Sequence, residues 1–361
     1  RRIHLDYAST TPVHPLAYRA MQPYFQKHWA NPGAVYAEGV RARQALEDAR
    51  LSVARILRVR SEDILFTGGG TESNNLAIFG VVEYLHATGR AFDDMEILTT
   101  KIEHPSILEA VAVLAAQGVR VTYVPILESG RIDMERFKTL LSSKTVLVTT
   151  AYVNSEIGVV QDIKKLTRIV RAWFNEHTAH VLVHVVACQA PLWFSCAVDM
   201  LGADLLTLDA GKCYGPKGVG VLVRRHRIPL RPRTFGGGQE GGLRSGTENV
   251  PLIVGCAKAI ERAQQQHEKR SALVKTLRDQ FFRLLTVHVP QSVVNGSLEH
   301  RAPNNVNISI LGLDSEYAVI WLDAKCIAAS TKSACGAGKG NGSDVVREMT
   351  RDEKRALSTI R

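Results

Sequence analysis

The sequence lacks a long apolar run. Its apolar stretches are interrupted well before about 18 residues, the length that a membrane-spanning helix requires. The opening residues 1–4 also lack the apolar region of a secretory signal. We therefore expect a cytosolic protein with no membrane segment. Because residue 1 is not Met and residues 358–361 carry no evident end signal, we also expect at least one terminus to be trimmed.

Paired cysteines are missing as well. The six cysteines show neither CxxC nor Cys/His spacing, which argues against a zinc site and against the disulfide framework of a secreted protein. We predict no metal site, and we expect most of these thiols to be small buried groups. They are residues 188, 196, 213, 256, 326 and 335.

Aromatic residues make up only 6% of the chain and are absent from its densest basic cluster, residues 224–233. The net charge of +10 would suit an acidic partner or nucleic acid. Segments that bind nucleic acid interleave basic and aromatic side chains, and no RNA- or DNA-binding module is recognisable. We therefore do not expect nucleic acid as a partner, and the cluster faces either solvent or an acidic protein.

What is present is an alternation of strands and helices. A chain of 361 residues with 45% hydrophobic content can bury a full core and is expected to form two lobes. Buried strands separated by helices predict an α/β fold, with a mainly parallel central sheet and helices on both faces. The predicted strands span 64–66, 96–99, 119–124, 146–151 and 180–186, and the helices span 37–57, 76–85, 107–116, 134–141 and 163–174.

A smaller α+β lobe is expected to follow the glycine-rich residues 236–249. It begins with one long helix over about 252–285. Strands at 306–310 and 327–329, with a helix at 315–322, complete the predicted lobe.

Residues 67–75 place three glycines between a buried strand and an apolar-periodic helix. The first turn of a helix offers unpaired N–H donors, and glycines let an anion approach the backbone closely. Thr71 and Ser73 add side-chain donors, which favours a phosphate site. The alternative is a tight strand-to-helix turn without a ligand.

Lys212 lies between two apolar strands, 205–208 and 219–223, in a glycine-rich stretch. It is either a solvated surface residue or an amine held beside a ligand. A desolvated lysine amine can condense with an aldehyde, which is how enzymes attach pyridoxal phosphate. Ligands of parallel sheets bind beyond the carboxyl ends of the strands. Three further segments follow strand ends and are expected to converge there: 67–75, 152–158 and 187–189.

A second glycine-rich segment, residues 330–342, contains Cys335. Its apolar content is too low for packing, so we expect it to be mobile. Mobility would let an exposed thiol travel to a substrate and then away from it.

Seven short motifs occur along the chain, at residues 5–12, 69–75, 103–104, 153–161, 212–218, 244–247 and 332–335. Their order and spacing together resemble the pyridoxal-phosphate-dependent cysteine desulfurases of the NifS/IscS type. This resemblance covers nearly the whole chain and implies the fold of the aspartate aminotransferase superfamily, fold type I. It implies a large cofactor-binding domain of residues 10–250 and a small domain of residues 1–9 and 251–361, whose last part we expect to be truncated.

The resemblance also implies roles for the motif residues. Lys212 would bind the cofactor covalently and then carry the substrate proton, and the resemblance, not the spacing, selects it over Lys217. His104 would lie against the pyridine ring, where an imidazole can exchange protons. Gly70 and Thr71 would bind the phosphate.

Further residues would hold the rest of the cofactor and the substrate. Asn154 and Gln189 would hydrogen-bond the cofactor's phenolic oxygen, and Asn154 would also contact the substrate. Thr247 would reach the phosphate from the other subunit of a homodimer. Arg361 would bind the α-carboxylate of L-cysteine. Cys335 as a thiolate would attack the substrate sulfur, which would leave L-alanine and an enzyme persulfide.

Some residues depart from the pattern of this family. Val186 replaces an aspartate that keeps the pyridine nitrogen protonated, which removes a hydrogen bond of about 1.5–3 kcal/mol. That loss would slow carbanion formation by about 10- to 100-fold if nothing compensates. Asp209 and Gly211 replace two phosphate donors, and a carboxylate beside a phosphate lowers affinity. Residues 31–36 lack the loop histidine of the family.

Three functions therefore stay open. The first is a working cysteine desulfurase that passes sulfur to an acceptor such as an iron–sulfur scaffold protein, or to tRNA thiolation. The second is a catalytically impaired homologue that serves as a scaffold or regulatory partner. The third is a lyase for selenocysteine or another β-substituted amino acid.

Overall fold

A seven-stranded sheet forms the centre of the computed structural model, which describes residues 2–177, 180–332 and 342–361. The order of its strands is β2-β8-β7-β6-β5-β3-β4. Four neighbouring pairs are parallel, and β8 runs antiparallel to both of its neighbours. The sheet is therefore mainly parallel, as predicted. Its strands are β2 (Ile64–Thr67), β3 (Glu96–Thr99), β4 (Arg120–Tyr123), β5 (Thr145–Ala151), β6 (Leu182–Val186), β7 (Leu205–Asp209) and β8 (Gly220–Arg224).

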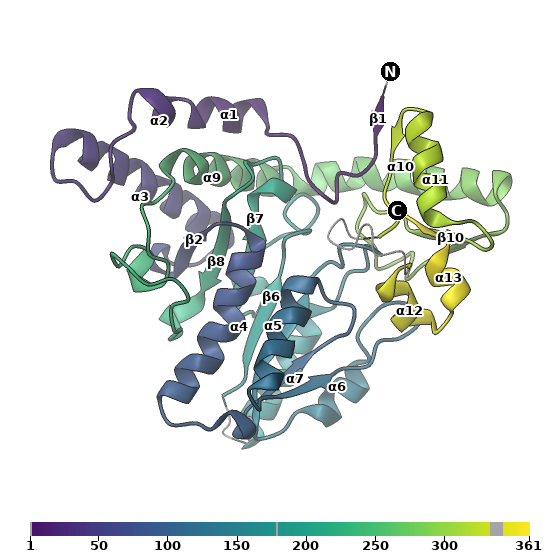
Figure 1. Ribbon diagram of the computed structural model, residues 1–361, viewed down its shortest axis with the longest axis horizontal. Coiled ribbons are helices and arrows are strands. Elements are labelled where there is room, and N and C mark those ends of the chain that lie inside the picture. The colour runs from purple at the N-terminus through teal and green to yellow at the C-terminus, as the bar shows by residue number, and fades with distance from the viewer. Residues whose placement is uncertain (1, 178–179, 333–341) are drawn as a thin grey trace.

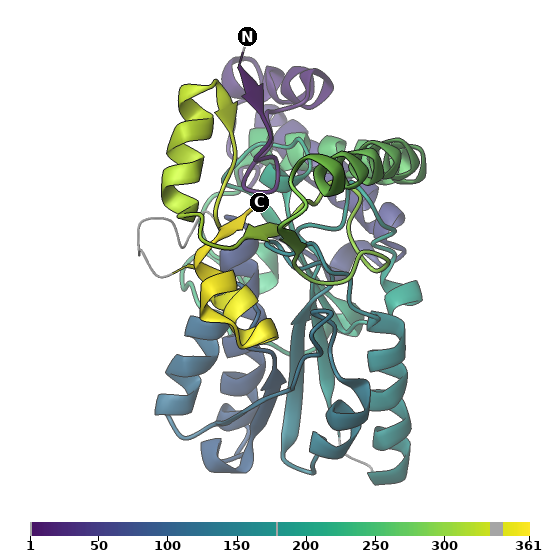
Figure 2. The same ribbon diagram turned by 90° about the vertical axis from the view of Figure 1, so that its right-hand side faces the viewer.

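Helices cover both faces of this sheet (Figure 2). Most residues of β5, β6 and β7 are buried, as expected for strands that are covered on both sides. On one face a hydrophobic cluster joins α4 (Gly70–Ala87) and α5 (Pro105–Ala116) to the sheet. On the other face a larger cluster joins α3 (Ala37–Leu57), α7 (Ile163–His177) and α9 (Val250–Gln265). The short helices α6 (Met134–Leu140) and α8 (Val198–Leu201) contact α7.

The predicted long helix over 252–285 is in fact two helices, which is a correction. After α9, the chain turns at Gln266 (φ −119°, ψ 4°), and α10 (His267–His288) begins. No glycine or proline lies between residues 256 and 288, so the sequence carries no ordinary marker of this break. Two further helices, α1 (Pro15–Met21) and α2 (Pro23–Gln26), lie near the start of the chain, and both contact α9 (Figure 1).

The two ends of the chain meet in small sheets beside the main one (Figure 1). Strand β1 (Ile3–His4) pairs in parallel with β11 (Ile327–Ala328). A separate antiparallel sheet has the order β12-β10-β9. The pairing of β1 with β11 supports the proposed grouping of residues 1–9 with the C-terminal segment, and the domain boundaries stay a prediction. The remaining elements are β9 (Ser292–Val294), β10 (Ile308–Ile310), β12 (Thr359–Ile360), α11 (Ser315–Ala324), α12 (Asp344–Thr350) and α13 (Glu353–Leu357).

Short 3₁₀ helices complete the connections between these elements. They are η1 (Ser61–Asp63), η2 (Phe92–Asp94), η3 (Ala210–Lys212), η4 (Arg225–Arg227) and η5 (Glu240–Gly242). Within the three described ranges, no helix has the length and apolar character needed to cross a bilayer.

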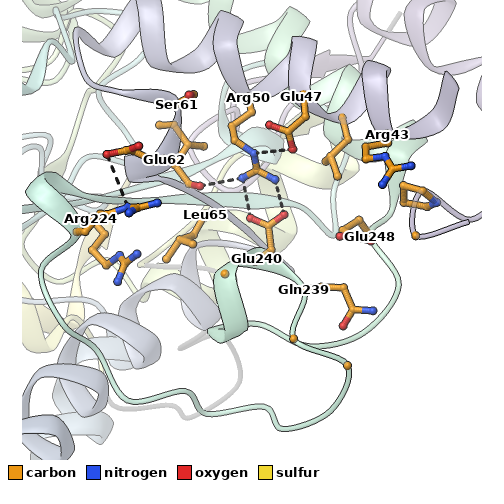
Figure 3. A pocket seen from close by; sticks show the side chains of 18 residues that line it. Arg43, Glu47, Arg50, Ser61, Glu62, Leu65, Arg224, Gln239, Glu240 and Glu248 are labelled. Atoms are coloured by element: carbon orange, nitrogen blue, oxygen red, sulfur yellow. Dashed lines mark hydrogen bonds and ion pairs between the residues drawn. The ribbon is translucent and has the colours of Figure 1, made fainter. Parts of the chain in front are cut away.

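A buried ion pair fastens a glycine-rich connection to the core. A cavity of about 560 Å³ lies between α3, β2 and residues 237–241, and Arg50 and Glu240 meet across it (Figure 3). The two terminal guanidinium nitrogens of Arg50 each lie 2.8 Å from an oxygen of the Glu240 carboxylate. The same carboxylate accepts the N–H of Phe66 at 2.9 Å. Glu240 has a φ of 51°, a left-handed conformation that non-glycine residues adopt at a cost, so these bonds help to hold it.

We expect Glu240→Ala to lower the free energy of unfolding by about 3–5 kcal/mol, because it removes the buried carboxylate that pairs with Arg50 and leaves only the more exposed Glu47, at 3.3 Å. Urea denaturation followed by circular dichroism measures this change. Asp323→Ala is the control, since it breaks the exposed Arg2–Asp323 pair and should cost less than about 1 kcal/mol. Equal losses in the two variants would contradict a special role for the buried pair.

Candidate functional site

Strand ends from across the sheet meet at a single cavity. Strands β3, β5, β6 and β7 are parallel, and β2 runs in the same direction because β2 and β7 are both antiparallel to β8. Their carboxyl ends therefore lie at one edge, where a cavity of about 180 Å³ opens. Seven predicted site residues line it: Gly70, Thr71, His104, Asn154, Gln189, Lys212 and Arg361.

Of the two remaining predicted site residues, one does not line the cavity and the other cannot be placed. Thr247 is exposed and does not line it, and the partner subunit from which it was expected to act is not part of the structure. Cys335 falls outside the described residues.

The amine of Lys212 points at the backbone of the N-terminal segment. Lys212 closes η3, directly after β7, and its Nζ donates to the carbonyl oxygens of Ala8 (3.5 Å) and Ser9. Gln189 donates to the same Ala8 carbonyl at 2.9 Å. Lys217 instead donates to the carbonyl of Thr11 and does not line the cavity. The structure thus places Lys212, and not Lys217, among the cavity residues.

A short hydrogen-bonded chain orients His104. The imidazole caps α5, and its Nδ1 accepts the N–H of Ser106 at 3.1 Å. The Ser106 hydroxyl lies 2.9 Å from Nδ1 and accepts the side-chain amide of Asn74 at 2.8 Å. Because Asn74 donates to this hydroxyl oxygen, the hydroxyl hydrogen is available for Nδ1. We therefore assign Nδ1 as the acceptor and Nε2 as the protonated nitrogen of neutral His104.

The surroundings of His104 favour that neutral form. Burial lowers the pKa of His104, and the positive charge of Lys212 lowers it further, while the carboxylate of Asp209 acts in the opposite direction. The unprotonated nitrogen of this neutral imidazole, Nδ1, is occupied by Ser106, so it can accept a proton only after these hydrogen bonds break.

The neighbouring Glu103 has a structural role. Its carboxyl group is fully buried and accepts hydrogen bonds from the hydroxyls of Thr100 (2.8 Å) and Thr150 (2.9 Å) and from the N–H of Ala151 (2.9 Å). Burial raises the pKa of Glu103 to about 7, and these hydrogen bonds oppose the rise. Glu103 therefore ties the end of β3 to the end of β5 and fixes the backbone that carries His104.

The glycine run forms the start of α4, and its amides already have acceptors. The N–H of Gly68 donates to Glu72 (2.7 Å), that of Gly69 to the hydroxyl of Thr67 (3.4 Å), and that of Gly70 to Asp209 (3.0 Å). Gly69 has a φ of 149°, which requires glycine. Helix α4 begins at Gly70, earlier than the predicted start at residue 76.

Ser73 does not serve as the expected donor. Its hydroxyl lies 2.7 Å from the hydroxyl of Thr67, it is fully buried, and it does not line the cavity. Thr71 does line the cavity and is exposed. Of the two side-chain donors suggested by the sequence, the structure leaves only Thr71 in position to meet a ligand.

Arg361 forms part of the cavity wall. Its guanidinium donates to Asp6 at 2.6 Å and to the carbonyl oxygen of Ser155 at 2.8 Å. The side chain is only 5% exposed, and its Nε is buried without a partner among the described residues. A buried guanidinium N–H with no acceptor is costly, so Arg361 is suited to a carboxylate ligand.

Asn154 shapes the loop after β5. Its side-chain oxygen accepts the N–H groups of Glu156 (2.9 Å) and Ile157 (3.0 Å), and its amide donates to the carbonyl of Ile102 (2.8 Å). One amide hydrogen is left for a ligand, since the NH₂ group carries two.

Apolar and neutral groups line the cavity next to β6. Val186, at the end of β6, is 8% exposed and belongs to the hydrophobic cluster under α4 and α5, so it offers no charge to a ligand. Cys188 lies nearby, and burial raises the pKa of its thiol well above the ordinary value. Its thiol therefore stays protonated and is a poor nucleophile.

Sequence reasoning missed Asn74, Ser106 and the carbonyl groups of Ala8 and Ser9. Asn74 lies three residues after Thr71 in α4, so helical spacing could have placed both on one face. Its Oδ1 is buried and has no partner among the described residues, although the side chain lines the cavity. Backbone carbonyls carry no side-chain pattern, so no feature of the sequence indicates those of Ala8 and Ser9.

The whole chain can be compared with known proteins. The chain matches the family described as Aminotransferase class-V over residues 3–350. It is 36% identical over 361 residues to "Cysteine desulfurase IscS" of Dictyoglomus turgidum. The alignment covers 100% of this chain and 89% of that protein. It is 37% identical over 367 residues to "Cysteine desulfurase, mitosomal" of Trachipleistophora hominis. This alignment covers 100% of this chain and 81% of that protein.

Solved structures agree with this match. The structure is similar to "NIFS-LIKE PROTEIN", with a TM-score of 0.91, 31% identity and coverage of 100% of this chain and 93% of the other. It is also similar to "SspA in complex with cysteine", with a TM-score of 0.84, 30% identity and coverage of 100% and 97%. The fold predicted from the sequence is confirmed.

We expect the two charges beside His104 to move its pKa in opposite directions. Lys212→Met removes a positive charge that disfavours the imidazolium, so the pKa of His104 should rise; Asp209→Asn removes a favourable negative charge, so it should fall. NMR titration of the ring C–H resonance measures both changes. Lys217→Met should leave the titration unchanged. Shifts of the same sign in the first two variants would contradict the proposed electrostatics.

Proposed function

The chain belongs to the class-V aminotransferase family, and on this basis we propose that it is a pyridoxal-phosphate-dependent cysteine desulfurase. The proposed reaction converts L-cysteine into L-alanine and leaves the sulfur as a persulfide on Cys335. The observation that carries the proposal is the meeting of Lys212, His104, Gln189 and Arg361 in one cavity at the carboxyl edge of the sheet. The names of its relatives give further support.

Most of the cavity fits the proposed cofactor. Pyridoxal phosphate, when bound, supplies an aldehyde for covalent attachment and a ring that takes up electrons from the substrate. Lys212 would hold the aldehyde, and His104 would lie against the ring. Gln189 and the remaining amide hydrogen of Asn154 offer donors to its oxygen atoms. The unpartnered Oδ1 of Asn74 also favours a polar ligand here.

The phosphate end fits less well. Gly70 and Thr71 would bind the phosphate, but the Gly70 amide already donates to Asp209. The place expected for the pyridine nitrogen also fits less well, because Val186 leaves the wall near β6 apolar. These two features favour the second candidate function, a catalytically impaired homologue that acts as a scaffold or regulatory partner.

Lys212 and His104 would handle protons in the proposed reaction. In the described structure the amine of Lys212 is held by the carbonyls of Ala8 and Ser9, so it must leave them to act as a base or nucleophile. Neutral His104 can accept a proton at Nδ1 only if its bonds to Ser106 break. Both groups are thus held in defined positions before a ligand arrives.

Arg361 would orient the substrate. Its planar guanidinium suits the α-carboxylate of L-cysteine, and one of its N–H groups already lacks a partner. Its contacts with Asp6 and Ser155 fix the guanidinium plane. A rearrangement that frees a second N–H from Asp6 would allow bidentate binding.

Cys335 would receive the sulfur. Its thiolate attacks the sulfur of bound cysteine, the carbon–sulfur bond of the substrate breaks, and a sulfur–sulfur bond forms on the enzyme. The carbon takes up a proton, so that alanine and the persulfide account for all atoms. This role rests on the family resemblance, because Cys335 lies outside the described residues.

We further propose a homodimer. Large apolar side chains are exposed around the loops next to α2 and η5, with Trp29 at 75%, Val35 at 88% and Phe235 at 76% exposure. Such apolar surface is typical of an interface. Thr247, exposed on its own chain, would then reach the cavity of the other subunit. The iron–sulfur scaffold as acceptor, tRNA thiolation and the cytosolic location stay predictions.

We expect the purified protein, supplied with pyridoxal phosphate, L-cysteine and a thiol reductant, to release sulfide and alanine in equal amounts. Lys212→Ala and Cys335→Ala should each lower the rate at least about 100-fold, because each removes a nucleophile. Cys326→Ala is the matched control, since this cysteine is exposed and does not line the cavity.

Other outcomes would contradict the desulfurase proposal. Sulfide release that survives Cys335→Ala would exclude the persulfide step. Turnover of selenocysteine that is independent of Cys335, with no release of sulfur from cysteine, would support the selenocysteine lyase. Absence of turnover with every substrate would support the scaffold or regulatory function.

A further inference from the structure

The carboxylate of Asp209 occupies the position at the start of α4 where an anionic ligand would bind. One of its oxygens accepts the N–H of Gly70 at 3.0 Å, and the other accepts the N–H of Gly211 at 2.8 Å. Asp209 ends β7, three residues before Lys212, and it lines the same cavity. The lysine and this carboxylate therefore belong to a single site.

Helix α4 makes this position attractive to an anion. It is 18 residues long, and the partial positive charge at its N-terminus stabilises a negative group there. In this chain the negative group is the carboxylate of Asp209. Glu72 meets the preceding amide of Gly68 and pairs with Arg244, so this cation is already engaged as well.

A second observation shows that the site is built for a ligand. Asn74, in the first turns of the same helix, is 2% exposed and lines the cavity, and its Oδ1 has no partner among the described residues. A polar atom is costly when buried without a partner, and a ligand could supply one.

A phosphate group at this position would compete with Asp209. It would need the same Gly70 amide, and it would bring up to two negative charges beside an existing carboxylate. The glycine backbone also packs closely against Cys188 and Asp209. A side chain at Gly70 would come within 2.9 Å of the sulfur of Cys188, and one at Gly69 within 3.5 Å of Asp209.

We propose that the carboxylate of Asp209 takes the place of a bound anion and so stabilises the ligand-free cavity. It thereby cancels the gain in binding affinity that a phosphate group would give to an aldehyde ligand. The site therefore binds pyridoxal and pyridoxal phosphate with similar affinity. This inference rests on the proposed function for its aldehyde ligand, and it concerns a step that precedes any turnover.

Equilibrium binding of the two aldehydes tests the inference without measuring activity. Asp209→Asn keeps the shape of the side chain and removes its charge. We expect this variant to bind pyridoxal phosphate at least about 10-fold more tightly than the wild type, and to bind pyridoxal within about 2-fold of it. Asp199→Asn, a surface change on α8, is the matched control and should alter neither affinity.

A second measurement uses inorganic phosphate, which needs no chemistry at Lys212. In chloride buffer, Asp209→Asn should melt at a lower temperature than the wild type, because the start of α4 loses its anion. Added phosphate at matched ionic strength should raise the melting temperature of Asp209→Asn more than that of the wild type or of Asp199→Asn.

The two proposals fail in different ways. A wild type that binds pyridoxal phosphate at least about 10-fold more tightly than pyridoxal, with Asp209→Asn unchanged, would overturn the role of Asp209 and leave the desulfurase proposal intact. If borohydride reduction and mass measurement show neither aldehyde on Lys212, the desulfurase proposal fails. The phosphate measurement then still decides the role of Asp209, because an equal effect of phosphate on wild type and variant would overturn it.

Discussion

Strands that run in one direction bring their ends to one edge of a sheet, and the cavity depends on this geometry. Glu103 strengthens it, because one buried carboxyl group holds the end of β3 against the end of β5. His104 is the next residue after Glu103, so its backbone is held in place by the same contacts. Lys212 reaches the same place from the end of β7 through a single 3₁₀ turn. His104, Gln189 and Lys212, which are far apart in the sequence, therefore line one cavity without belonging to one element.

The cavity combines a familiar set of reactive groups with an unusual electrostatic balance. Lys212 and Arg361 provide positive charge, and Asp209 provides negative charge at the end where a phosphate would be expected. Val186 keeps the neighbouring wall apolar. We expect these differences to affect how strongly a cofactor binds, whereas Lys212 and Arg361, the groups proposed to attach the cofactor and to orient the substrate, both line the cavity. Binding and chemistry are therefore best measured separately in this protein.

The sequence predicted the elements whose patterns are local. The central strands follow from apolar runs, and the position of Lys212 between two strands follows from the glycines around it. It could not indicate that the helix predicted over 252–285 breaks at Gln266, because no proline or glycine marks that break. Nor could it indicate where the Asp209 carboxylate would turn, since its partner Gly70 lies 139 residues away. Contacts of backbone carbonyls, such as that of Ala8 with Lys212, leave no pattern in a sequence.

The ion pair between Asp6 and Arg361 affects when the cavity can be completed during synthesis on the ribosome. Its two partners are 355 positions apart, and Arg361 also donates to the carbonyl of Ser155, which follows β5. Loop closure over such a separation comes late, and domains emerge from the ribosome in order from the N-terminus. The central sheet can form while synthesis continues, but the wall that Arg361 provides must wait until residue 361 has been made. A nascent chain thus carries the reactive lysine well before it carries the arginine that would align a substrate with it.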